Sequence, residues 1–278
     1  MRFPLLCVCL LLSRFPVSAA VQANSATFRT GDGVTLHYFE AGHGPAIVLI
    51  PGWTMAADIF EPQINSLSSQ FRVIALDPRS QGDSEKTSDN NTLERHAKDI
   101  EELLEHLQLQ SAVLVGWSNG VPDVLTFVEQ NGTSKVSGIV LVDGLVNASG
   151  MQPSMAGMLK SFQADRTKFT DGFVRSMYTS KQTEAYIAHV KEQSLKTPTN
   201  TAVVEIYNVQ SIGDFTQILP KIDKPVLYVC EEYLALQGKL VRDELPKARV
   251  EVFQKAGHAL FVDQADKFNA LLTEFARH

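Results

Sequence analysis

Short segments made only of apolar residues recur along the chain, and longer stretches with helical periodicity separate them. Residues 46–50 (AIVLI) and 112–115 (AVLV) are examples. A strand with one face in water alternates polar and apolar residues, whereas these segments do not alternate, which is typical of strands covered on both faces. The predicted strands are residues 27–30, 34–40, 46–50, 72–76, 112–115, 138–142, 225–229 and 250–253. The pattern predicts an α/β fold with a mostly parallel, eight-stranded sheet flanked by helices.

The rhythm of strand and helix breaks at residues 149–219. This segment is rich in Met, Lys, Gln and aromatic residues, and long strand-like runs are absent from it. It is much longer than one crossover connection needs, although two ordinary crossover helices are the alternative. We therefore expect a helical cap at 149–219, inserted between two parts of the core at 24–148 and 220–278.

The N-terminus has the form of a signal peptide. One arginine precedes an apolar run at residues 5–12, and small residues follow, with possible cleavage sites after Ala19 and Ala23. The run is shorter than the roughly 18 to 20 residues of a membrane-spanning helix, although Arg14 behind it fits an anchor as well. We expect residues 1–23 to be removed and the protein to be exported to the periplasm or secreted, without a stable membrane anchor.

Composition excludes several classes of function. The formal charge is −6, from 25 Lys and Arg against 31 Asp and Glu, and no basic run occurs, so a nucleic-acid partner has no electrostatic support. Two of the 3 Cys lie in the predicted signal peptide, which leaves Cys230 alone and excludes a disulfide framework. We expect Cys230 to be buried and inert. Metal-ligand spacings and dinucleotide-binding glycine motifs are also missing from the sequence, so no metal and no cofactor is expected.

The segment that carries chemistry follows the apolar run at 112–115. It reads Gly116-Trp117-Ser118-Asn119-Gly120 and leads into a helical stretch at 121–130. A Gly-x-Ser-x-Gly sequence between a strand and a helix places serine on a tight turn, where side chains at both glycines would collide with neighbouring elements. Ser118 is therefore the candidate nucleophile, and an ordinary helix-capping serine is the alternative.

Together with three other segments, this motif resembles the α/β-hydrolase fold superfamily, in its serine esterase and haloperoxidase-like branch, over residues 27–278. The other segments are Pro51-Gly52-Trp53 after a strand, the turn Asp77-Pro78-Arg79-Ser80-Gln81-Gly82-Asp83-Ser84, and Gly257-His258 after the last strand. Two positions depart from the family pattern, with Pro51 in place of His and Ser80 in place of Gly.

The resemblance implies a base that follows the serine and the acid in the chain. Of the three histidines after Ser118, His278 is the last residue and His189 lies in the predicted cap. His258 is thus the candidate general base, able to take the serine proton and return it to the leaving group.

The acid is less well defined. The family most often has an Asp shortly after the seventh strand, where this chain has Leu234. Asp143, which follows the strand at 138–142, is the favoured acid, because haloalkane dehalogenases and certain lipases of the family place it there. Glu231 or Glu232 is the alternative, and absence of a strict triad is another.

By position in the family, the backbone N–H groups of Trp53 and Asn119 form the oxyanion hole. Only their backbone is implicated, so their side chains are free to shape the pocket. Trp117 either packs in the core or flanks the site. Methionines and phenylalanines indicate an adaptable apolar binding region or, alternatively, the cap's own core: Met55, Phe60, Met151, Met155, Met158, Phe162 and Phe169.

The sequence therefore predicts an exported serine hydrolase that cleaves a small-molecule carboxylic ester or lactone through an acyl-enzyme. A cofactor-free perhydrolase of the haloperoxidase type and a catalytically silent, ligand-binding member of the fold are the alternatives. Nothing in the sequence indicates an oligomeric state.

Overall fold

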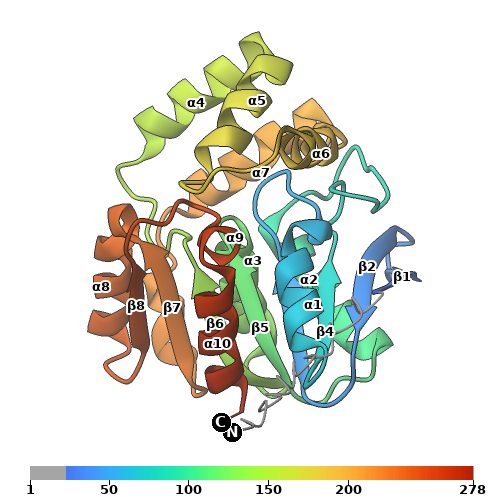
Figure 1. The fold of residues 1–278 in the computed structure, drawn as a ribbon, viewed down its shortest axis with the longest axis vertical. Helices are drawn as coiled ribbons and strands as arrows, with labels where there is room; N and C mark the ends of the chain where they lie inside the picture. The colour runs from blue at the N-terminus through green and yellow to red at the C-terminus, as the bar shows by residue number, and fades with distance from the viewer. Residues whose placement is uncertain (1–22, 278) are drawn as a thin grey trace, which may run out of the picture.

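The computed structural model describes residues 23–277, so the predicted signal peptide, apart from Ala23, lies outside the described residues. The core is one eight-stranded sheet in the order β1-β2-β4-β3-β5-β6-β7-β8 (Figure 1). The first two strands pair antiparallel to their neighbours, and all other pairs are parallel. The predicted fold class is thus confirmed. The strands are β1 (Asn24–Arg29), β2 (Thr35–Ala41), β3 (Ala46–Ile50), β4 (Arg72–Leu76), β5 (Ala112–Trp117), β6 (Val136–Val142), β7 (Val226–Glu231) and β8 (Arg249–Phe253).

Both faces of the central strands are buried, because successive side chains point to opposite faces and helices cover each one. In β3, for example, Ile47 and Leu49 belong to one hydrophobic cluster, and Val48 and Ile50 belong to the other. The first cluster includes side chains of α1 (Glu61–Leu67), α9 (Leu260–Asp263) and α10 (Ala265–Ala276). The second includes side chains of α2 (Leu93–His106), α3 (Gly120–Asn131) and α8 (Ala235–Glu244).

Several strands extend beyond their predicted ends, and β1 and β5 are two examples. β1 begins at Asn24, which pairs with Glu40 of β2, and its residues are mostly exposed because β1 is an edge strand. In the middle of the sheet, β5 continues through Gly116 and Trp117, which pair with Leu141 and Val142 of β6. The apolar runs marked the buried parts of these strands and not their polar or glycine-containing ends.

Between β6 and β7 the chain forms four α-helices that lie together above the sheet, at the top of Figure 1. They are α4 (Gln152–Ala164), α5 (Arg166–Ser176), α6 (Glu184–Leu195) and α7 (Thr199–Ile212), and we refer to them as the cap. The two connections to the core run side by side, since Ala148 N–H donates to Gly213 O at 2.5 Å and Phe215 N–H donates to Val146 O at 2.9 Å. The chain therefore enters and leaves the cap at one place, between residues 146–148 and 213–215.

The turn at residues 77–84 is tied to the neighbouring loop, since the Asp77 carboxylate accepts the Ala57 N–H at 2.6 Å and the Asp83 N–H at 2.8 Å. Ser80 in this turn has a φ of 66°, in the left-handed region that favours glycine. That conformation accounts for the glycine of the family pattern at this position. Ser80 adopts it while its Oγ accepts the Thr87 N–H at 3.0 Å.

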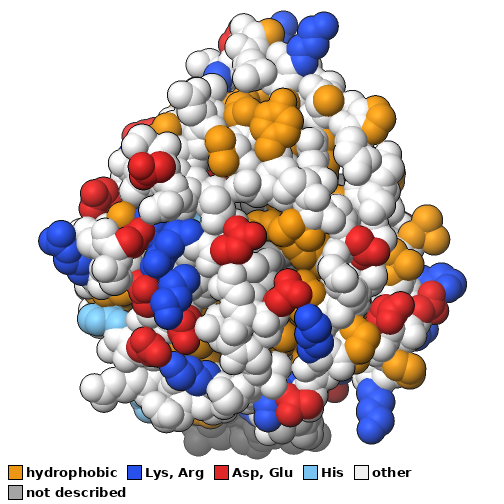
Figure 2. All heavy atoms as spheres, turned by 180° about the vertical axis from the view of Figure 1, so that it is seen from behind, with side chains coloured by type: hydrophobic (Ala, Val, Ile, Leu, Met, Phe, Trp, Pro, Cys, Tyr) orange, Lys and Arg blue, Asp and Glu red, His pale blue; other side chains and the backbone are white. Residues whose placement is uncertain are grey.

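None of the helices formed by residues 23–277 is both long and apolar enough to cross a membrane. Figure 2 shows the face opposite to that of Figure 1, where acidic and basic side chains are intermixed below and hydrophobic side chains form clusters in the upper half. The large hydrophobic side chains that are exposed belong to α7 and to the start of α8 and the turn before it: Val204, Tyr207, Ile212, Tyr233 and Leu236.

Candidate active site

Ser118 lies on the sharp turn between β5 and α3. Its φ is 55°, an uncommon conformation for a residue with a side chain. The flanking glycines allow the turn to form, because a Cβ on Gly116 would lie 2.2 Å from Gly120 O, and a Cβ on Gly120 would lie 2.5 Å from Ile50 O. The backbone is packed too tightly around the turn for Ser118 to relax, which is how strained conformations persist at functional sites.

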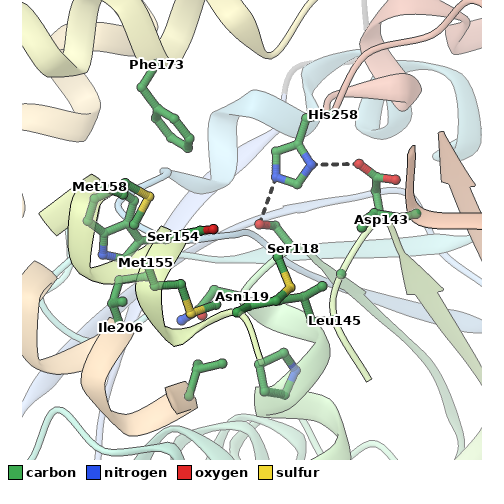
Figure 3. Close-up of a pocket in the computed structure, with 16 residues that line it drawn as sticks. Ser118, Asn119, Asp143, Leu145, Ser154, Met155, Met158, Phe173, Ile206 and His258 are labelled. Atoms are coloured by element: carbon green, nitrogen blue, oxygen red, sulfur yellow. Dashed lines mark hydrogen bonds and ion pairs between the residues drawn. The ribbon is translucent and has the colours of Figure 1, made fainter. Parts of the chain in front are cut away.

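The structure brings Ser118, His258 and Asp143 together in one hydrogen-bonded row (Figure 3). Ser118 Oγ lies 2.8 Å from His258 Nε2, and His258 Nδ1 lies 2.7 Å from Asp143 Oδ2. The three residues come from the ends of β5 and β6 and from the loop after β8. The carboxyl ends of parallel strands meet at one edge of the sheet, and residues far apart in the chain can meet there.

Asp143 is fully buried, with 0% of its surface exposed. Its φ of 45° is also in the left-handed region, and its second oxygen, Oδ1, accepts the Glu231 N–H at 2.7 Å. The carboxylate is therefore held between the backbone of β7 and the imidazole of His258. This orientation fixes His258 with Nδ1 as the donor, so that Nε2 faces the serine as the acceptor.

The alternative acids occupy other positions. Glu231 contributes its backbone N–H to Asp143, and Glu232 Oε2 accepts the Lys255 N–H at 3.3 Å. Leu234, at the family's usual position for the acid, lies in the wall of the cavity beside Ser118. Among residues 23–277, Asp143 is the carboxylate hydrogen-bonded to His258.

The loop that carries His258 is fixed on both sides. Trp117 is buried, and its indole N–H donates to His258 O at 2.9 Å. On the cap side, Ala259 N–H donates to Met177 O at 2.9 Å. Gly257 fits there because a Cβ on it would lie 2.5 Å from the same Met177 oxygen. His258 is thereby held against Ser118 from the core and from the cap.

The two predicted oxyanion donors flank Ser118. A Cβ on Gly52 would lie 2.7 Å from Ser118 Cβ, so the backbone just before Trp53 is in contact with the nucleophile. Neither the Trp53 N–H nor the Asn119 N–H has a hydrogen-bond partner among residues 23–277. Two unpaired backbone donors beside a serine are what a developing oxyanion requires.

A cavity of about 280 Å³ opens next to Ser118 and His258, between the core and the cap. Apart from Asp143 and His258, its lining carries no ionisable side chain, so it favours neutral, apolar groups. The residues that line it are Trp53, Ser118, Asn119, Pro122, Asp143, Gly144, Leu145, Met151, Ser154, Met155, Met158, Phe173, Ile206, Val209, Leu234 and His258.

The apolar residues singled out in the sequence divide into three groups. The three methionines of the cap's start line the cavity, whereas Phe162 and Phe169 pack against Trp53. The expectation for Met55 and Phe60 is wrong, because both are buried in the core cluster under α1. Sequence reasoning missed Phe173, Ile206 and Val209, whose contribution depends on how α5 and α7 pack and leaves no local signal.

Two other reactive groups are accounted for by structure alone. Cys230 is buried in β7, and burial, followed by the charge of Asp143, raises the pKa of its thiol to about 12, which leaves it unreactive. His37, Asp77 and Asp83 offer ligand atoms close enough for a metal ion. The Asp77 oxygens, however, already accept hydrogen bonds from two backbone N–H groups, and Oδ2 also lies 2.7 Å from His37 Nδ1, so this cluster serves the turn at 77–84.

Comparisons with known proteins agree with this geometry. A family model described as alpha/beta hydrolase fold matches residues 45–265. A putative non-heme chloroperoxidase of Synechocystis sp. is 27% identical over 94% of this chain and 99% of its own. An esterase from Exiguobacterium antarcticum superposes with a TM-score of 0.86 at 21% identity, covering 92% of this chain and all of its own. A bromoperoxidase from Bacillus anthracis gives 0.84 at 22% identity, with the same coverage.

Proposed function

The chain belongs to the α/β hydrolase fold family, in the branch of esterases and haloperoxidases, and on that premise we propose that it is a serine hydrolase that cleaves a carboxylic ester or a lactone. The observation that carries the proposal is the row Ser118, His258 and Asp143, with distances of 2.8 and 2.7 Å, at the mouth of an apolar cavity. The family assignment alone supports a hydrolase. The arrangement of Ser118, His258 and Asp143 supports the narrower proposal of a serine hydrolase that acts on esters or lactones.

In the acylation step, Ser118 Oγ attacks the carbonyl carbon of the substrate while its proton passes to His258 Nε2. The carbonyl oxygen becomes an oxyanion, which accepts hydrogen bonds from the N–H groups of Trp53 and Asn119. The imidazolium then gives the proton to the leaving alcohol oxygen, the carbon–oxygen bond breaks, and the acyl group stays on Ser118. Asp143 stabilises the positive charge that His258 carries between these transfers.

Deacylation repeats the sequence with water. His258 Nε2 takes a proton from water, the hydroxide oxygen bonds to the acyl carbon, and the same two N–H groups hold the second oxyanion. Its collapse breaks the bond to Ser118 Oγ, which regains the proton from His258, and a carboxylic acid leaves. No cofactor takes part in either step.

The cavity defines the general class of substrate. Its lining is almost entirely apolar, and Met151 and the two methionines labelled in Figure 3, Met155 and Met158, can adapt to ligand shape. A charged group placed there would lose its hydration without gaining a partner. We therefore propose a neutral small molecule with an apolar substituent next to the ester or lactone group.

A second candidate function is perhydrolysis, in which hydrogen peroxide replaces water in deacylation and yields a peracid. The similarity to the Synechocystis protein named as a putative non-heme chloroperoxidase favours it. The same three residues serve, because peroxide, like water, loses a proton to His258 as its oxygen attacks the acyl carbon.

Export belongs to the proposal as well, on the sequence of residues 1–23 alone. N-terminal sequencing of the protein from the periplasmic or culture fraction tests it. A start at Ala20 or Asn24 is expected, and full-length protein retained on the membrane would contradict it.

Hydrolysis of an aryl ester tests the proposed function, measured with and without hydrogen peroxide for the parent and for Ser118→Ala. Multiple turnovers by the parent that Ser118→Ala abolishes support a serine hydrolase, and peracid formation supports the second candidate. Tight binding of esters without turnover would mean that the fold serves for binding only.

A further inference from the structure

The Trp53 side chain lines the cavity, as expected, and it is also fixed by contacts with the cap. Its indole N–H donates to Ala202 O in α7 at 2.7 Å, and only 5% of the residue is exposed. Its ring centroid lies 5.0 Å from that of Phe162 and 5.6 Å from that of Phe173, both in the cap. Among residues 23–277, Trp53 is the one member of the cap's hydrophobic cluster that comes from the core.

The next residue is tied to the cap as well. Thr54 Oγ1 lies 2.8 Å from Ser194 Oγ of α6, and both side chains are buried. Thr54 also has a φ of 60°, which is costly for a β-branched residue and needs support from its surroundings. Two consecutive residues of the loop after β3 are thus hydrogen-bonded to two different cap helices.

The same loop reaches the nucleophile through its backbone. Gly52 contacts Ser118, and the Trp53 N–H beside it has no partner among residues 23–277. The amide and the indole of Trp53 share one Cα, so the position of the indole in the cap limits where the amide can point. A small displacement of α7 or α6 relative to the core would move this donor relative to the carbonyl oxygen of a substrate.

The geometry points to Trp53 as a positioning residue. Through its contacts with the indole of Trp53, the cap sets the position of the Trp53 N–H in the oxyanion hole. This inference rests on the proposed function and deepens it. An apolar acyl chain that fills the space among Met155, Met158, Phe173 and Ile206 (Figure 3) packs against the elements that hold Trp53. Binding energy from a part of the substrate far from the scissile bond would thereby raise kcat and not only lower KM.

The substrates that follow are neutral esters with an apolar acyl chain longer than acetyl. For these, kcat should increase with chain length until the cavity of about 280 Å³ is full. A pocket that only binds the chain would lower KM and leave kcat unchanged.

The test measures kcat and KM for aryl acetate, butyrate and hexanoate. Trp53→Phe keeps the backbone N–H and an aromatic ring but removes the donor to Ala202 O. Ser194→Ala removes the bond to Thr54 from the cap side. Lys191→Ala, on the same helix α6, removes an ion pair to Asp171 within the cap and is the matched control.

We expect the ratio of kcat on hexanoate to kcat on acetate to fall about tenfold in Trp53→Phe, the equivalent of one buried hydrogen bond. A smaller fall in the same direction is expected in Ser194→Ala, and none in Lys191→Ala. An unchanged ratio in Trp53→Phe, or a change confined to KM, overturns the inference while leaving the proposed function intact. If Trp53→Phe fails to fold, Ser194→Ala decides in the same way. Absence of ester turnover by the parent overturns both.

Discussion

The indole N–H of Trp117 donates to the backbone carbonyl of His258 at 2.9 Å, and the two rings lie 5.2 Å apart. The residue directly before Ser118 therefore holds the loop that carries His258, 141 positions further along the chain than Trp117. This contact joins the end of β5 to the loop after β8 and so helps to fix the distance between the Ser118 and His258 side chains.

Replacement of Trp117 by Phe should lower kcat about tenfold, since it removes one buried hydrogen bond but keeps an aromatic ring against Phe60 and Phe261. KM should change less than about threefold, because Trp117 does not line the cavity. Steady-state kinetics on an aryl ester give both constants. A change in KM with kcat intact would contradict the role assigned to this contact.

Asp143→Asn should lower kcat on the order of 10³-fold or more, because an amide can hold His258 in the wrong tautomer. The matched control is Glu231→Gln, whose neighbouring carboxylate has no hydrogen bond to His258 and whose backbone N–H is retained. A loss of less than about tenfold is expected for it. Equal losses in the two variants would show that Asp143 is not the acid.

Gly52→Ala should abolish most activity, because the added Cβ would lie 2.7 Å from Ser118 Cβ and 3.2 Å from its Oγ. Gly157→Ala in α4 is the counterpart, since a Cβ there meets nothing within 4 Å. That variant should be more stable by about 0.5–1 kcal/mol, from helix propensity. Thermal melts and kcat values of both variants check this. Full activity in Gly52→Ala would contradict the close contact between the Gly52 backbone and Ser118.

Stability should fall as the pH rises from about 4.5 to about 9, and a buried cluster between cap and core is one cause. Burial raises the pKa of Glu205 in α7 from 4.5 to about 8. Burial lowers the pKa of His96 in α2, but the charge of Asp123 and a hydrogen bond to it outweigh burial and raise that pKa from 6.5 to about 9. Asp99 also faces His96. Both pKa values lie above those of the unfolded chain, so the folded state binds these protons more tightly. The resulting stabilisation is lost as the pH rises from about 4.5 to 8 for Glu205 and from about 6.5 to 9 for His96.

Glu205→Gln should flatten that decrease, because a neutral amide mimics the protonated acid at every pH. Melting temperatures at about pH 5, 6, 7, 8 and 9 measure it, with the exposed Glu129→Gln of α3 as control. The part of the decrease that persists belongs to His96. An identical pH dependence in Glu205→Gln and the parent would contradict this origin.

The sheet could be predicted from the sequence because burial on both faces demands unbroken apolar runs, as in β3 and β6. The start of β1 could not, since an edge strand is exposed and its residues Asn24 and Ser25 carry no apolar signal. Ser80 illustrates a second limit of prediction from sequence. Its backbone adopts the left-handed conformation that favours glycine, although the residue itself does not signal it.

The candidate site was partly visible in the sequence for similar reasons. Ser118 and His258 lie in local motifs whose glycines are required because the backbone packs closely against neighbouring segments. These glycines make both residues recognisable in the sequence. The choice among Asp143, Glu231 and Glu232 depends on which strand end faces His258, and only the packed sheet defines that. The link from Trp53 to Ala202 joins residues 149 positions apart and has no signal in either segment.

The central claim is that Ser118 is an activated nucleophile. Intact-mass spectrometry after exposure to a fluorophosphonate probe tests it most directly, with Ser118→Ala and Asp143→Asn treated in parallel. The account predicts one adduct on the parent, none on Ser118→Ala, and slower formation on Asp143→Asn. No adduct on the folded parent, or an adduct that persists in Ser118→Ala, would contradict it.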